Sequence, residues 1–253
     1  RSYYARPRQF EHKKSSIDLV TQADRDSEKL VVGSLRDAFP DHHIHGEEGG
    51  GYGPAPEVTP YHWYVDPLDG TTNFAHRLPI FSVSIALTDP ELHPLLGVVY
   101  NPMHEQCFTA IRGEGAWLNG DPLHVSTTDN LGQALACTGF SYDNWTNPTN
   151  NIDHFAHFMS RTQGVRRLGS AALDLCFVAA GQLDVYWERN TNPWDVQAGL
   201  LCVLEAGGHI TDHEGQINAT ALSGKRILAT NGLLHDQALT VLTQGDAAPR
   251  PTA

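Results

Sequence analysis

The sequence is poor in cysteine. Its 253 residues include four cysteines, which are widely separated, lie in apolar stretches and form no CxxC pair. This usage favours buried free thiols in a reducing cytoplasm over a disulfide framework. Histidine, in contrast, is plentiful, with 14 residues, but no HExxH motif organises them. Between a zinc site at His42, His43 and His45 and ordinary strand or surface histidines, we favour the second interpretation.

Basic residues are also scarce, and long apolar runs are missing. The chain has 17 Lys and Arg against 29 Asp and Glu, a net charge of −12. This balance argues against a nucleic-acid or anionic membrane partner. An anionic substrate stays possible, because metal ions held by carboxylates reverse the local charge. We recognise no signal peptide and no run that would span a bilayer, so we expect a cytoplasmic protein with no membrane segment.

The remaining composition is that of an ordinary globular protein, with 40% hydrophobic and 9% aromatic residues. The length suffices for one large domain or two small ones. Because no internal repeat or linker stands out, we expect a single domain over 1–253. Its halves would be about 1–130 and 131–245, followed by a tail at 246–253.

The most informative stretch is Trp63–Phe74. An apolar run typical of a buried strand leads into Asp66 and Asp69, which are three residues apart. Gly70 then permits close backbone approach, and Thr71 follows where a helix could begin. A capped Asx turn is the plain alternative. We favour a Mg²⁺ site that bridges to a phosphate, because oxygen ligands select hard cations and helix starts attract anions.

Two further acidic segments precede this stretch in the chain. A helix is predicted with Asp24 as its N-cap, running to Pro40. The segment His42–His45 reads as a strand, and the glycine-rich segment 46–51 after it reads as a flexible loop. Glu47 in that loop is either part of a solvated acidic turn or a further ligand beside the strand of Asp66.

The rest of the chain predicts more strands and helices. Alternation and turn signals between 80 and 122 indicate an antiparallel meander. In the second half we predict strands near 134–139, 165–168, 183–187, 209–211 and 227–230, and helices near 152–161, 171–180, 194–206 and 233–242. Asp195 falls in the first turn of one helix, where it either favours the helix dipole or completes a cation site. Glu188 is either a solvated strand end or a group for sugar hydroxyls.

Taken together, these motifs resemble the inositol monophosphatase family. They are Asp18-Leu-Val-Thr-x-Ala-Asp24, Gly46-Glu-Glu48, Asp66-Pro-Leu-Asp-Gly-Thr-Thr-Asn73, Gly169-Ser-Ala-Ala172, Trp194-Asp-Val-x-Ala-Gly199 and Glu205-Ala-Gly-Gly208. The resemblance runs from about Lys14 to Asn231. It implies a layered αβαβα fold, with a largely antiparallel first half and an α/β second half. It also implies a lithium-sensitive, Mg²⁺-dependent phosphomonoesterase, usually a homodimer, that acts on a small phosphorylated polyol through a metal-activated water.

The resemblance also implies roles for individual residues. Two to three Mg²⁺ ions would be bound by Glu47, Asp66, the Leu68 carbonyl, Asp69 and Asp195. Gly70 and Thr71 would bind the phosphate, while Thr71 with Asp24, Glu47 and Lys14 would serve catalysis. Substrate hydroxyls would meet Gly169, Ser170, Ala171 and Glu188.

One departure and several alternatives accompany the resemblance. The family begins with an amphipathic helix, whereas about a dozen residues precede Lys14 here, with Pro7 among them. Inositol monophosphate is our first choice of substrate. Histidinol phosphate and fructose 1,6-bisphosphate are alternatives within the superfamily. A regulatory module that binds RNA or the transcription machinery is the alternative of another class, although the acidic charge weighs against RNA.

Overall fold

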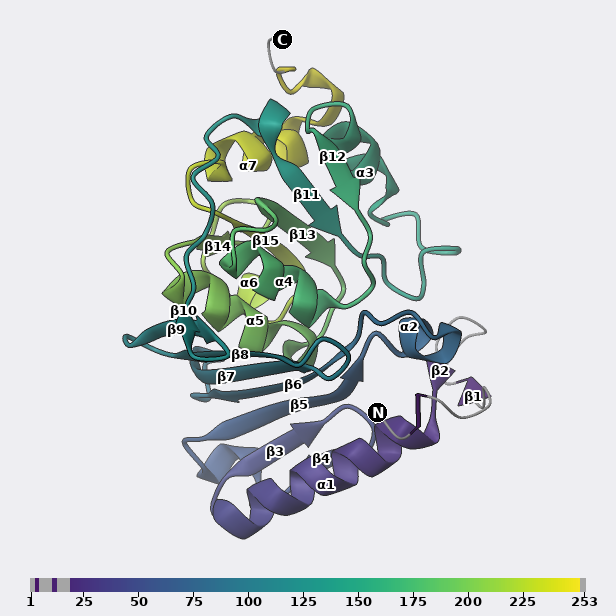
Figure 1. Cartoon of the computed structure of the whole chain (residues 1–253), viewed down its shortest axis with the longest axis vertical. Coiled ribbons are helices and arrows are strands. Elements are labelled where there is room, and N and C mark those ends of the chain that lie inside the picture. The colour runs from purple at the N-terminus through teal and green to yellow at the C-terminus, as the bar shows by residue number, and fades with distance from the viewer. Residues whose placement is uncertain (1–2, 5–10, 13–18, 251–253) are drawn as a thin grey trace.

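Two β-sheets alternate with three layers of helices (Figure 1). The computed structural model describes residues 3–4, 11–12 and 19–250. Helix α1 (Gln22–Ala38) packs on the first sheet, helices α4 (Ala171–Ala179) and α5 (Pro193–Glu205) lie between the sheets, and α3 (Ile152–Met159) and α7 (His235–Gln244) cover the second sheet. The predicted αβαβα layering is therefore confirmed. The prediction of a single domain stays a prediction.

The first sheet has eight strands in the order β10-β9-β8-β7-β6-β5-β3-β4. Every neighbouring pair is antiparallel except β3 with β5, so the predicted meander is confirmed. A separate pair is formed by β1 (Glu11–His12) and β2 (Leu19–Val20). The strands of the large sheet are β3 (His43–Gly46), β4 (Gly50–Tyr52), β5 (His62–Asp69), β6 (Ser82–Thr88), β7 (Pro94–Asn101), β8 (Gln106–Ile111), β9 (Gly115–Leu118) and β10 (Asp121–Pro122).

The second sheet has five strands in the order β12-β11-β13-β15-β14. Strand β11 pairs in parallel with both β12 and β13. Strand β15 pairs antiparallel with both β13 and β14. Each predicted strand and helix of this half is present within two residues of its expected bounds. The strands are β11 (Leu135–Thr138), β12 (Gly164–Arg166), β13 (Val185–Arg189), β14 (His209–Thr211) and β15 (Arg226–Thr230).

Short helices complete the fold. Helix α2 (Thr71–His76) follows β5 directly, as the sequence predicts. Helix α6 (Ala219–Leu222) was not predicted, and Asn218 caps it by accepting hydrogen bonds from two backbone N–H groups. Three 3₁₀ turns occur at Pro56–Val58, Leu131–Gln133 and Gly245–Ala247. Within the described residues, no helix combines the length and apolar character needed to cross a bilayer.

The main core lies around α4 and α5, which are buried between the two sheets. The two helices approach closely at Gly199, where an added Cβ would lie 2.6 Å from the Cβ of Leu175. Packing of this kind fixes helix positions, because interiors are dense and leave little room for adjustment. The first turns of α4 and α5 are therefore held firmly, and both border the candidate site. The four cysteines are free thiols, as predicted, and Cys137, Cys176 and Cys202 are buried.

Two predictions near the first sheet were wrong in detail. Thr21, not Asp24, is the N-cap of α1; Asp24 is the third helical residue and returns a hydrogen bond in a capping box. The segment 46–51 is not a flexible loop, because Gly50–Tyr52 forms β4 and pairs with β3. Glu28 of α1 fastens this turn by accepting hydrogen bonds from the N–H groups of Glu48 and Gly49, at 2.8 and 2.7 Å.

Candidate functional site

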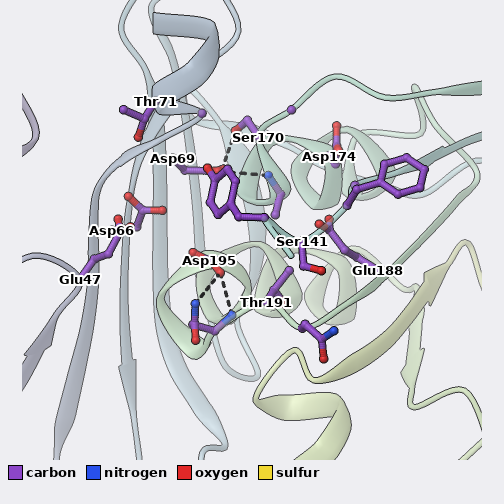
Figure 2. Close-up of a pocket in the computed structure, with 18 of the residues that line it drawn as sticks. Glu47, Asp66, Asp69, Thr71, Ser141, Ser170, Asp174, Glu188, Thr191 and Asp195 are labelled. Atoms are coloured by element: carbon purple, nitrogen blue, oxygen red, sulfur yellow. Dashed lines mark hydrogen bonds between the residues drawn. The ribbon is translucent and has the colours of Figure 1, made fainter. Parts of the chain in front are cut away.

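A polar pocket lies between the two halves, and carboxylates line it from both sides (Figure 2). The ends of β3 and β5 contribute acids on one side, and the second sheet with α4 and α5 contributes acids on the other. The acidic lining residues are Glu47, Asp66, Asp69, Asp174, Glu188 and Asp195. All five candidate positions that the sequence places in Asp66–Thr71, which are all its residues except Pro67, therefore border one space together with Glu47 and Asp195.

The parallel pairing of β3 with β5 brings Glu47 beside Asp66. Gly46 is the register partner of Val65, and the Glu47 N–H donates to the Val65 carbonyl at 3.2 Å. Glu47 at the end of β3 therefore lies level with Asp66 in the neighbouring strand β5. Parallel pairing of the two strands thus brings the two acids together. The interpretation of Glu47 as a residue beside the strand of Asp66 is the one that this geometry favours over a solvated turn.

Asp66 is influenced by the charges of three other carboxylates. Its side chain is buried, and its Oδ1 accepts a hydrogen bond from the Leu68 N–H at 2.9 Å. Burial, followed by the neighbouring charges of Glu47, Asp69 and Asp195, raises the pKa of Asp66 well above its ordinary value. A cation among these groups would remove that penalty, since opposite charge favours the ionised form.

Asp69 connects the two halves of the chain. Its Oδ2 accepts hydrogen bonds from the Ser170 hydroxyl at 2.6 Å and from the Ala172 N–H at 2.8 Å. Its Oδ1 lies 3.3 Å from the Ala171 nitrogen, which donates to it. Burial raises the pKa of Asp69 to about 6, although the bonds from Ser170 and Ala172 act in the opposite direction. The first turn of α4 thus positions this carboxylate.

Asp195 enters the pocket from the start of α5. Pro193 occupies the beginning of the helix, and Asp195 closes a capping box in which its Oδ2 accepts from the Asn192 N–H at 2.7 Å. Burial, together with the charges of Glu47 and Asp69, raises the pKa of Asp195 well above its ordinary value. Asp195 therefore caps a helix and also lines the pocket, while its role in a cation site stays a prediction.

Thr71 and Asp24 form a buried pair beside the pocket. The Thr71 Oγ1 lies 3.1 Å from Asp24 Oδ1 and 3.1 Å from the Leu68 carbonyl oxygen, and it donates to these acceptors. Asp24 Oδ2 accepts from the N–H and the hydroxyl of Thr21, at 2.8 and 2.6 Å. Burial raises the pKa of Asp24, while the bonds from Thr21 oppose that shift. Asp24 thus fixes the orientation of the Thr71 hydroxyl.

Two glycines with positive φ allow the halves to meet at the pocket. Gly70 has φ of 93° and Gly169 has φ of 91°, values that disfavour other residues. A Cβ at Gly70 would lie 3.1 Å from the Gly169 carbonyl oxygen, and one at Gly169 would lie 2.5 Å from Nη1 of Arg167. The positive φ accounts for both glycines, and close approach of the backbone is a second reason at Gly70.

Glu188 lies in β13 on the second-sheet side of the pocket. Its Oε2 accepts a hydrogen bond from the Tyr186 hydroxyl at 2.8 Å. A Cβ at Gly139 would lie 2.2 Å from the other oxygen, so the missing side chain there makes room for this carboxyl group. Burial raises the pKa of Glu188 to about 7. The side chain is buried rather than at a solvated strand end.

The pocket is also lined by residues to which no individual role was assigned from the sequence. They are Arg167, Asp174, Phe140, Ser141, Tyr142, Gly139, Asn190, Thr191 and Asn192. The sequence held one usable signal, because Asp174 is a lone acid among the apolar residues of α4. Lys14, a predicted catalytic residue, lies outside the described residues. Ser170 and Ala171 line the pocket, and both donate a hydrogen bond to Asp69.

The donor set fits a hard divalent cation. Side-chain and backbone oxygens of Glu47, Asp66, Leu68, Asp69 and Asp195 all border the pocket, and no sulfur or imidazole ligand competes among its lining residues. Over the described ranges, no three His, Cys, Asp or Glu side chains already surround a point that could hold an ion. The ligand roles assigned to these residues therefore stay predictions.

Comparison with known proteins gives consistent results. A profile described as the inositol monophosphatase family matches residues 1–246. An inositol-1-monophosphatase of Synechocystis sp. is 45% identical over 93% of this chain and 80% of that protein. The Nus factor SuhB of Pseudomonas aeruginosa is 45% identical over 81% of this chain and 76% of its own length. The solved inositol monophosphatase of Anabaena (Nostoc) sp. has a TM-score of 0.85 and 45% identity, covering 90% of this chain and 88% of that one.

Proposed function

The chain belongs to the inositol monophosphatase family and is a phosphatase, and from this premise we propose that it hydrolyses the monophosphate of a small polyol. Inositol monophosphate is the first choice, because the relatives at 45% identity include a protein named inositol-1-monophosphatase. The observation that carries the proposal is the pocket in which Glu47, Asp66, Asp69 and Asp195 meet from both halves of the chain.

We propose Mg²⁺ as the ion. The residues that would hold it are Glu47, Asp66, Asp69 and Asp195 with the Leu68 carbonyl, in two sites and a weaker third near Glu47. When bound, Mg²⁺ would supply Lewis-acid charge that offsets the charge developing on the phosphoryl group. Lithium sensitivity and a homodimeric state stay predictions of the resemblance, and a cytoplasmic location stays a prediction from the sequence.

Residues of the protein would bind the phosphate, orient the attacking water and bind the leaving alcohol. Gly70 and Thr71 border the pocket at the start of α2, where backbone N–H groups suit a phosphate. The Thr71 hydroxyl donates to Asp24, so its oxygen lone pairs are available to accept a proton of an attacking water and orient it. Glu188, across the pocket, would accept a hydrogen bond from a hydroxyl of the leaving alcohol.

Turnover of three esters side by side tests the substrate. Inositol 1-phosphate, histidinol phosphate and fructose 1,6-bisphosphate would each be supplied with the wild-type protein and Mg²⁺, with phosphate release as the measurement. We expect the highest kcat/KM on inositol 1-phosphate. A negligible rate on that ester, with turnover of another, would transfer the assignment to the other ester.

Asp69→Asn tests the metal role. This change removes a ligand charge while preserving size, so we expect a loss of several orders of magnitude in kcat. Addition of EDTA to the wild type should abolish turnover, and Mg²⁺ should restore it. A loss of only a few-fold in Asp69→Asn would contradict the assigned role.

A regulatory function is the second candidate, favoured by the relative named a Nus factor. The same variant separates the two functions. If Asp69→Asn has no turnover but binds a single-stranded RNA probe as tightly as the wild type, the protein has a binding role independent of catalysis. The net charge of −12 leads us to expect no measurable RNA binding at 0.15 M salt by either form.

A further inference from the structure

One buried acid of the pocket has no role in the proposed reaction. Asp174 lies in the first turn of α4 and lines the pocket, with 1% of its surface exposed. Its Oδ1 is buried and has no hydrogen-bond partner among the described residues. Buried polar atoms are almost always paired, and an unpaired one costs about 1–3 kcal/mol. The free acceptor therefore suggests a partner that arrives with a ligand.

The surroundings of Asp174 do not explain it as a structural residue. The residues on either side of it in the chain, Ala172, Leu173, Leu175 and Cys176, are buried and apolar. Burial, followed by the charge of Glu188, raises the pKa of Asp174 well above its ordinary value, while Arg167 acts in the opposite direction. An apolar residue at this position would avoid this desolvation cost.

Asp174 lies on the side of the pocket that the leaving alcohol would occupy. Figure 2 shows Asp174 and Glu188 together on one side, with Glu47 and Asp66 across the pocket. A phosphate at Thr71 and the candidate metal ligands would direct its alcohol toward Asp174 and Glu188. Glu188 accepts from Tyr186 through Oε2. Asp174 Oδ1 is buried and has no hydrogen-bond partner among the described residues, so it can accept from a bound alcohol.

We propose that Asp174 is a specificity residue that accepts a hydrogen bond from a hydroxyl of the substrate alcohol. With Glu188 it offers two acceptors, which select alcohols that carry at least two hydroxyl groups beside the ester. This inference rests on the proposed function and refines it by naming a residue that recognises the alcohol. An ester whose alcohol has no hydroxyl leaves both acceptors unpaired and gains nothing from them.

The test compares two esters in the wild type and in Asp174→Ala. Inositol 1-phosphate carries hydroxyl donors, whereas p-nitrophenyl phosphate carries none on its leaving group. We expect Asp174→Ala to raise KM for inositol 1-phosphate about tenfold, the effect of one lost hydrogen bond to a carboxyl group. The KM for p-nitrophenyl phosphate should change less than about twofold. Asp174→Asn, which keeps a carbonyl acceptor, should recover most of the lost affinity.

Equal losses on the two esters would overturn the proposal, because a structural role affects both alike. Asp184→Asn is the matched control, since Asp184 is a buried acid outside the pocket lining that accepts from Ser126 and the Leu135 N–H. We expect it to lower the melting temperature without changing the ratio of the two KM values. If Asp174→Ala does not fold, Asp174→Leu fills the volume with an apolar group and gives the same comparison.

Failure of this inference differs from failure of the proposed function. A wild-type protein that hydrolyses p-nitrophenyl phosphate but not inositol 1-phosphate would refute the polyol assignment itself. A wild-type protein that prefers inositol 1-phosphate, and keeps that preference unchanged in both Asp174→Ala and Asp174→Leu, would refute only the role of Asp174.

Discussion

The Ser170 hydroxyl donates a hydrogen bond to Asp69 Oδ2 at 2.6 Å, although the two residues are 101 positions apart in the chain. Asp69 ends a strand of the first sheet, and Ser170 is the N-cap of α4, which packs between the sheets. One short bond thus sets the orientation of a proposed metal ligand from the opposite half of the molecule. Hydrogen bonds to charged groups are among the stronger ones in proteins.

Ser170→Ala should therefore lower kcat/KM about tenfold, because Asp69 loses one of its donors and gains freedom to rotate. Phosphate release at saturating Mg²⁺ measures the effect. Ser82→Ala is the matched control, since the Ser82 hydroxyl lies 3.4 Å from that of Ser170. A Ser82→Ala effect as large as that of Ser170→Ala would show that general packing, not the bond to Asp69, is responsible.

Thr71→Val should reduce kcat by about 10²–10⁴, the range for loss of a positioned proton-transfer group. Valine preserves the shape but cannot connect Asp24 to an attacking water. Thr71→Ser should retain most activity, because the hydroxyl remains. Asp24→Asn combined with Thr71→Val should add little to the single change, since both residues act through one hydroxyl. Fully additive losses would mean that the pair does not work as a unit.

Glu28→Gln should impair activity indirectly, through the turn beside Glu47 that Glu28 holds in place. Glu28 accepts from two backbone N–H groups of the turn after Glu47 and from the Tyr52 hydroxyl at 2.9 Å. Glutamine can replace only part of this set, because its amide nitrogen is a donor. We expect a higher Mg²⁺ concentration for half-maximal rate, while kcat at saturating Mg²⁺ changes less. An unchanged Mg²⁺ dependence would contradict the positioning role of Glu28.

Stability should depend on pH through His213. Its Nε2 lies 3.1 Å from the Ile227 carbonyl oxygen, and its Nδ1 is buried with no hydrogen-bond partner among the described residues. Burial, together with nearby Arg189 and His154, lowers the pKa of His213 from 6.5 to about 3. The unfolded chain therefore binds an extra proton below pH 6.5. Stability from this residue is complete above pH 6.5 and falls by up to about 1.4 kcal/mol per pH unit toward pH 3.

Urea unfolding at several pH values between 7 and 4 measures this effect. In His213→Gln, which can still donate to the Ile227 carbonyl, the loss of stability with falling pH should be shallower than in the wild type. Substitution of the exposed His124 by Gln should leave the slope unchanged. Parallel curves for wild type and His213→Gln would show that another group controls the acid response.

The elements with local signals in the sequence could be predicted from it. Alternation defined the meander, and Gly70 with Thr71 marked the start of α2, because turn and helix-start chemistry acts over a few residues. The bond from Asp69 to Ser170 could not be foreseen, since it depends on how two sheets pack. The same holds for Glu28, whose partners lie 20 and 21 residues away.

The errors have a common physical origin. Asp24 was expected to cap α1, but Thr21 three residues earlier can make both bonds of a capping box with it. The turn after Glu47 was expected to be flexible because of its glycines, yet those glycines make space for Glu28 and Tyr52. In each case a specific hydrogen-bond partner of the segment decided the outcome, and composition alone does not reveal such partners.

The meeting of two halves at the pocket also bears on synthesis of the chain. A ribosome that has released only the first half has made Glu47, Asp66 and Asp69, but not Ser170 or Asp195. Such a nascent chain carries repelling acids with no α4 turn to orient them. We therefore expect hydrolytic capacity to begin only after α4 and α5 have been synthesised and have packed against the first half.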